Sequence, residues 1–162
     1  MAASLSVRVY IGAAAGTESA VVTGVDFISA DNATNTLGNR TANPITVGTN
    51  SYEKWLKLKV DTAPANGVTN FKIWGDGAVM TSTTLNFTAA YVTGTTPTTA
   101  ASTIANTTFT NFTAGNKATW DSTSYTATNA TTKYTVFQLV VDSTAGPGNW
   151  TQETINFSYD ET

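Results

Sequence analysis

Apolar and polar residues alternate with a period of two along most of this chain. In residues 5–11 the odd positions are apolar, and similar runs lie at 21–28, 52–60, 71–73, 85–91, 137–141 and 155–159, with weaker ones at 104–112 and 117–126. Successive side chains of a strand point to opposite faces of its sheet, so this alternation predicts half-buried β-strands. Glycine, proline and asparagine clusters separate the runs, as turns require.

No stretch keeps a helical period over a full helix length with caps at its ends. The pattern therefore predicts an all-β chain, folded as an antiparallel β-sandwich or jelly roll of about eight to nine strands. Its length favours a single domain over residues 1–162. The apolar faces of the strongest runs predict the core, which we expect to contain Leu56, Leu58, Phe71, Ile73, Phe137, Leu139, Val141 and Phe157.

Two runs carry more specific expectations. Residues 133–141 are apolar on both faces over much of their length, which is typical of a central strand covered on both sides. Leu85, Phe87, Ala89 and Tyr91 occupy alternate positions, so they are expected to share one face of a strand.

Tryptophan and lysine share the polar faces of two neighbouring runs. Trp55 and Lys57 point away from the apolar face of the first run, as Lys72 and Trp74 do in the second. A hairpin that turns at residues 64–67 would bring all four onto one sheet surface. A large exposed apolar group marks a contact, so either the chain's own side chains cover these rings or another subunit does.

The chain lacks the residues on which most catalysis depends. It contains no histidine and no cysteine, and only 12% of its residues are charged. Groups that titrate or ligate metals near neutral pH are therefore scarce, and thiolate metal sites are excluded. We expect no enzyme activity, no catalytic residue, no cofactor and no metal site.

Charge and hydropathy limit the partners. The net charge is −3 and the chain has eight basic residues, so a broad basic face for nucleic acid is not expected. No apolar run reaches the length of a transmembrane helix, so no membrane partner is expected. The N-terminal residues have no positively charged region, so no signal peptide is expected there.

Three weaker candidates for chemistry have simpler explanations. A calcium site would use oxygen ligands, although the same residues favour turns; its candidates are Asp26, Asp31, Asn32, Asn35 and Asp76. A carboxylate pair for glycoside hydrolysis would come from the acidic residues near the C-terminus, which are Glu153, Asp160 and Glu161. The simpler explanation is that these acids belong to an exposed tail. A platform for sugar rings would come from the four tryptophans, which are Trp55, Trp74, Trp120 and Trp150. Tryptophan side chains fill hydrophobic cores equally well.

Five segments carry a family resemblance: residues 51–60, 70–75, 134–141, 146–148 and 155–161. In style of sequence the chain resembles small β-sandwich virion structural proteins of tailed bacteriophages, of the capsid decoration (cement) type. The resemblance implies a non-catalytic protein of the virion, assembled in the host cytoplasm. It also implies binding to the major capsid protein in an assembled lattice, which the bound protein stabilises, and a homo-oligomer, with a trimer favoured.

The resemblance transfers no individual functional residue. It adds the capsid to the surfaces that Trp55, Lys57, Lys72 and Trp74 could contact. A carbohydrate-binding or adhesin-like β-sandwich module remains the alternative function, and a tail protein is a third reading.

Overall fold

A computed structural model describes residues 2–12, 17–21, 24–31, 37–77, 82–91, 105–146 and 152–162. Within these residues the chain forms nine strands, one short α-helix and one 3₁₀ turn. The strands are β1 (Ser4–Ile11), β2 (Thr17–Val21), β3 (Lys54–Thr62), β4 (Val68–Gly75), β5 (Thr83–Tyr91), β6 (Thr107–Thr108), β7 (Ala118–Asp121), β8 (Tyr134–Val141) and β9 (Ile155–Glu161). The helical elements are α1 (Leu37–Ala42) and η2 (Phe109–Asn111).

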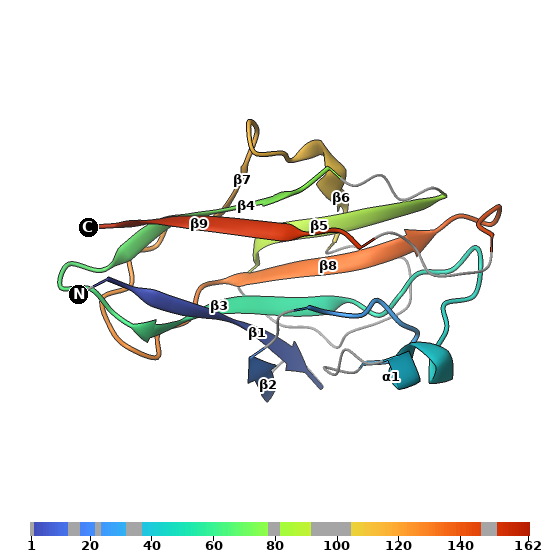
Figure 1. The fold of residues 1–162 in the computed structure, drawn as a ribbon, viewed down its shortest axis with the longest axis horizontal. Coiled ribbons are helices and arrows are strands. Elements are labelled where there is room, and N and C mark those ends of the chain that lie inside the picture. The colour runs from blue at the N-terminus through green and yellow to red at the C-terminus, as the bar shows by residue number, and fades with distance from the viewer. Residues whose placement is uncertain are drawn as a thin grey trace.

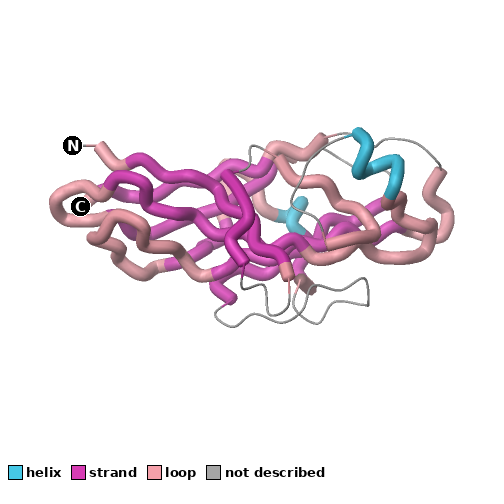
Figure 2. The backbone as a smooth tube through the Cα atoms, turned by 90° about the horizontal axis from the view of Figure 1, so that it is seen from below, coloured by secondary structure: helices cyan, strands magenta, loops and turns pink. Residues whose placement is uncertain are grey.

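The strands form two antiparallel sheets. The larger sheet has six strands in the order β2-β1-β3-β8-β5-β6, and the smaller has three in the order β7-β4-β9. Figures 1 and 2 show an elongated molecule with both chain termini at one end and α1 near the other. The predicted all-β antiparallel sandwich is confirmed.

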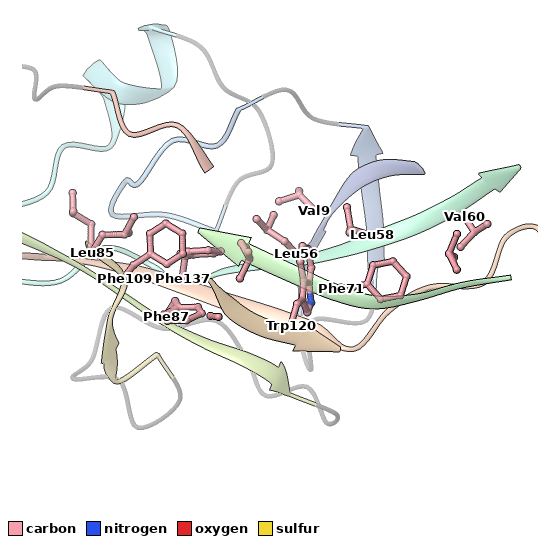
Figure 3. Packing of buried hydrophobic residues seen from close by; sticks show 14 of the residues in the cluster. Val9, Leu56, Leu58, Val60, Phe71, Leu85, Phe87, Phe109, Trp120 and Phe137 are labelled. Carbon is pink, nitrogen blue, oxygen red and sulfur yellow. The ribbon is translucent and has the colours of Figure 1, made fainter. Parts of the chain in front are cut away.

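The core lies between the two sheets, where the apolar faces of their strands meet (Figure 3). Seven of the eight predicted core residues are at most 4% exposed, and Phe157 is partly buried against the same cluster. Phe109 of η2 and Trp120 of β7 belong to the same cluster. The period-two pattern therefore identified the inward face correctly, because only that face escapes water.

Strand β8 is central, as predicted. It pairs with β3 on one side and β5 on the other, and all but one of its residues are buried. Phe137, Leu139 and Val141 face the smaller sheet, whereas Tyr134 and Val136 belong to a second apolar cluster. The apolar character of both faces therefore reflects cover on both sides of the larger sheet.

The predicted hairpin between the tryptophan-bearing runs is wrong. Strand β3 pairs with β1 and β8, whereas β4 pairs with β7 and β9 in the other sheet. The connection between them crosses from one layer to the other, and Gly67 at its end has a φ of +104°. A Cβ there would lie 2.9 Å from the Tyr125 carbonyl oxygen, so this crossing requires glycine. Crossing lets the two apolar faces bury each other across the sandwich.

The shared face expected for the β5 residues is also corrected. Thr88 pairs with Val136 of β8, but Tyr91 pairs with Tyr134, so one extra β5 residue is accommodated between these pairs. A bulge of one residue reverses which face the following side chains occupy. Phe87 consequently packs in the core, whereas Tyr91 packs in the second cluster.

Other predicted runs differ in extent. Residues 24–28 form no strand, although Val25, Phe27 and Ile28 are buried or partly buried. The run at 117–126 contains β7, and the run at 104–112 contains β6 and η2, with residue 104 outside the described part. Within the part of the chain that the structure describes, no helix has the length and apolar character needed to span a membrane.

Candidate functional site

The four residues predicted to form one surface lie on different layers. Trp55 and Lys57 belong to β3 of the larger sheet, whereas Lys72 and Trp74 belong to β4 of the smaller sheet. Each pair points away from the core, so the two pairs occupy opposite outer faces of the sandwich. The prediction that all four converge on one surface is wrong, since it depended on the hairpin. Whether either pair contacts a subunit or a capsid stays a prediction.

The outer face of the larger sheet covers its own tryptophan. Trp55 is 0% exposed, and its ring meets Tyr91 and Tyr134 edge-on at centroid distances of 5.3 and 5.1 Å. Its indole Nε1 donates a 3.2 Å hydrogen bond to Oε2 of Glu53, which is itself buried. Ala105 packs in the same cluster. The name Trp55 cluster is used here for six apolar and aromatic residues: Tyr10, Trp55, Tyr91, Ala105, Tyr134 and Val136.

Lys57 lies over the Trp55 cluster. Its Nζ is 4.1 Å from the centroid of the Tyr134 ring and 5.4 Å from that of Tyr10. Burial lowers the pKa of Lys57. Burial, and next the negative charge of Glu18, raises the pKa of Tyr10 to about 12. Glu18 also pairs with Arg8 at 3.4 Å. The polar groups of this face are thus engaged with one another.

The outer face of the smaller sheet is more open. Trp74 is partly exposed and lies opposite Asn156 of β9, while Lys72 lies opposite Ser158. Nζ of Lys117, an exposed residue, is 4.1 Å from the Trp74 ring centroid. We call these five residues the Trp74 face.

The Trp74 face is positively charged. Among the residues that the structure describes, neither Lys72 nor Lys117 has a carboxylate within 4.0 Å, whereas Arg8, Arg40, Lys59 and Lys133 all form ion pairs. The chain as a whole carries a net charge of −3. Two lysines beside an accessible indole therefore give these five residues a sign opposite to that of the whole protein, while the carboxylate of Asp160 lies further along the same side of β9, bonded to Asn70.

A groove of about 570 Å³ opens beside this face, at the edge of the sandwich between β5 and β7. Its lining mixes aromatic rings with hydroxyl and amide groups, including Tyr91, Phe112, Asn106 and Thr119. Among its described lining residues, Lys117 alone is charged. A volume in this range accommodates a small polar ligand, and the aromatic and amide groups suit a sugar ring.

The four tryptophans do not form a common platform. Trp120 is 1% exposed and its Nε1 donates a 3.0 Å hydrogen bond to the Lys133 carbonyl oxygen. Trp55 is fully covered, and Trp150 lies outside the described residues. Among the described tryptophans, Trp74 alone reaches the surface.

The acidic residues considered for calcium contact groups of the chain itself. Asp26 lies 3.8 Å from Arg40, and Oδ2 of Asp31 accepts a 2.7 Å hydrogen bond from the Gly12 N–H. Lys54 lies buried nearby, and burial lowers its pKa to about 8 against the opposing effect of both carboxylates. Asn32 and Asn35 lie outside the described residues. Within the described part, no three acidic side chains gather around a common point.

The C-terminal acids have separate surroundings. Burial, and next the charge of Asp76, raises the pKa of Glu153, whose carboxylate oxygens are buried. A Cβ on Gly75 would overlap Oε1 of Glu153, so this position leaves room for the carboxylate. Asp160 instead accepts a 2.6 Å hydrogen bond from Nδ2 of Asn70. No local sequence pattern links Asp76, which follows β4, to Glu153, which precedes β9, so their proximity could not be predicted.

Comparison with known proteins found no matching family model, no matching curated protein and no matching solved structure.

Proposed function

We propose that this chain is a non-catalytic virion structural protein of the capsid decoration type, which binds and stabilises an assembled capsid lattice through its Trp74 face. The observation that supports the proposal is that this face carries positive charge, unlike the protein as a whole, and leaves its tryptophan partly exposed. Lys72 and Lys117 flank a partly exposed indole, and neither has a carboxylate partner among the described residues.

The composition of the face suits a protein contact. Aromatic side chains are enriched in the centres of interfaces, while lysine is depleted there and belongs to the rim. Trp74 would supply the buried centre, and the two lysines would lie around it. A complementary surface would carry carboxylates, since opposite potentials speed encounter and fix orientation. We therefore expect an acidic patch on the major capsid protein.

The proposal places the protein in the virion after assembly in the host cytoplasm. Its partners are the major capsid protein and further copies of itself, with neither nucleic acid nor membrane involved. Two lysines give too few phosphate contacts to hold nucleic acid at physiological salt.

Co-sedimentation with a panel of undecorated tailed-phage capsids tests the proposal. We expect Trp74→Ala to weaken binding by roughly tenfold or more, as truncation of a residue at an interface centre does, and Lys72→Gln to weaken it less, as loss of a charge at the rim does. Lys59→Gln is the matched control, because Lys59 lies on the outer face of the other sheet and pairs there with Glu18. Absence of binding to every capsid, or equal loss in the control, would contradict the proposal.

A carbohydrate-binding module is the second candidate, and the groove between β5 and β7 favours it. Asn106 lies at this groove with its Oδ1 accepting a 3.3 Å hydrogen bond from Thr107, so its amide nitrogen is available to donate to a sugar hydroxyl. A glycan array with the native protein and an Asn106→Ala variant tests it. Specific glycan binding that this variant loses, together with no capsid binding, would favour the module.

A further inference from the structure

Strand β9 has the longest unpaired edge among the described strands. Four strands lie at sheet edges, and β2, β6 and β7 contain five, two and four residues. Strand β9 contains seven. Short edge strands resist pairing with another chain, whereas a long one offers a row of free N–H and C=O groups. In the described part of the chain, β9 pairs with β4 alone.

The edge of β9 lacks most of the features that block pairing, and its charged residues, Asp160 and Glu161, lie only at its C-terminal end. Its sequence contains no proline, lysine or arginine. The irregularity in its pairing with β4 falls on β4 between Thr69 and Lys72, where Asn70 has a φ of +54°. Strand β9 itself therefore continues without a bulge, and its outer edge remains regular enough to accept a strand.

The core-facing side of β9 is incompletely covered. Phe157 and Tyr159 are only partly buried, whereas Phe71 and Ile73 on the neighbouring β4 are 0% and 1% exposed. The same row of side chains thus becomes more exposed from the centre of the sheet to its edge. One more strand would cover this row.

We propose that the occupant of this edge is β9 of a second copy, paired antiparallel about a two-fold axis at Ser158. This register places Asn156 opposite Asp160 of the other copy, so an amide meets a carboxylate twice. It also places Phe157 opposite Tyr159 on the core side, and aromatic pairs across strands are stabilising. The two smaller sheets join into one sheet of six strands.

The charges of β9 select the antiparallel arrangement. Its acidic residues, Asp160 and Glu161, both lie at its C-terminal end. Antiparallel pairing keeps the two acidic ends apart, whereas parallel pairing would align them side by side, which is destabilising. Pairing also places the Trp74 faces of both copies on one continuous surface. The pairing itself does not depend on what the Trp74 face binds.

The mass in solution is the first test. Sedimentation equilibrium should give twice the chain mass of 17.0 kDa. A two-fold pair differs from the trimer that the resemblance implies, so the mass decides between them. A monomer at concentrations up to about 1 mM, or a trimer, would overturn the pairing.

Single cysteines locate the interface, since the chain has none of its own. Ser158→Cys would bring two thiols together at the axis, so a short bismaleimide should link the copies nearly completely. Thr119→Cys is the matched control, because Thr119 lies exposed on β7 at the other edge of the same sheet. Five strand spacings, roughly 24 Å, would separate the two control thiols. No linkage at Ser158, or equal linkage at both sites, would exclude this edge.

A charge swap fixes the register. Asn156→Asp should weaken the dimer by roughly 3- to 30-fold, because it places a carboxylate opposite Asp160 of the other copy twice. Adding Asp160→Asn to that variant exchanges the two groups and should restore the native affinity. Circular dichroism checks that each variant is folded. If the single variant keeps the native affinity, or if the double variant does not regain it, the register is wrong.

Discussion

The two outer faces of this sandwich have the same local sequence pattern, but their tryptophans differ in exposure. Each presents a tryptophan and a lysine on the polar side of an alternating strand. Trp55 is fully buried. Tyr91 and Tyr134 pack against its ring, and its indole N–H donates a hydrogen bond to Glu53. Trp74 is partly exposed beneath Lys117.

The difference depends on which strands lie beside each tryptophan. Trp55 lies on a strand within a six-stranded sheet, next to β8 and near the bulged end of β5, and both supply tyrosines. Trp74 lies in a three-stranded sheet, where its neighbour on β9 is Asn156. The wider sheet therefore builds a second apolar cluster on its outer face, and the narrower sheet leaves its indole available. Four measurements test this contrast.

The largest effect is expected from Trp55→Ala. Removing a fully buried indole leaves a cavity among Tyr10, Tyr91 and Tyr134, and it also leaves the buried Glu53 carboxylate without the indole donor. We expect unfolding free energy to fall by about 3–5 kcal/mol, measured by urea denaturation. A loss below about 1 kcal/mol would show that the Trp55 cluster is not packed as described.

Alkaline pH should weaken the Trp55 cluster next. The pKa of Tyr10 is about 12 in the fold, above the ordinary value of 10.0, so the fold favours the protonated phenol. The stability that this provides is complete below pH 10 and is lost as pH rises from 10 through 12. We expect a loss on the order of 1–2 kcal/mol in urea titrations across this range. Tyr10→Phe should flatten the decline, and an unchanged slope in that variant would exclude Tyr10 as its cause.

The two lysine–aromatic contacts give a matched pair. Lys57 over Tyr134 and Lys117 over Trp74 have the same 4.1 Å distance, but Lys57 is partly buried and Lys117 is exposed. Lys57→Met should cost about 1 kcal/mol of unfolding free energy and Lys117→Met about 0.5 kcal/mol or less, because water weakens the exposed contact. Equal costs in thermal or urea unfolding would contradict the difference in cover.

Trp74→Ala should cost far less stability than Trp55→Ala. Its side chain is partly exposed and Lys117 lies over its ring, so the cost should be about 1 kcal/mol or less. The same variant should lose binding to undecorated capsids, as proposed above. A loss of several kcal/mol in urea denaturation would place Trp74 with Trp55 as a packing residue.

Some features of both faces followed from local pattern and some did not. Alternation correctly placed Leu56, Leu58, Phe71 and Ile73 toward the core, because strand geometry ties the side of each residue to its parity. Parity failed at Tyr91, where one extra residue reversed the face. A bulge is a property of two paired strands, so the β5 sequence alone does not reveal it.

Alternation also predicted the side of the strand on which each candidate contact residue lies, but not which residues come together. Trp55, Lys57, Lys72 and Trp74 were correctly placed on outer faces, since each lies one residue from a core position. Their separation onto two surfaces was missed, because a short connection at residues 63–67 permits either a hairpin or a crossing between layers. Lys117, Asn156 and Ser158, which complete the Trp74 face, lie far from Trp74 in the chain and no local signal joins them.

Local alternation along the chain is enough to predict an antiparallel β-sandwich and the buried side of most strands. Both follow from a period that depends only on neighbouring residues. Which strands pair, and so which tryptophan is covered and which reaches solvent, depends on the packing of the whole fold. Strand pairing joins residues such as Trp74 and Asn156, which are distant in the chain, and it is decided by burying the apolar faces of all strands together.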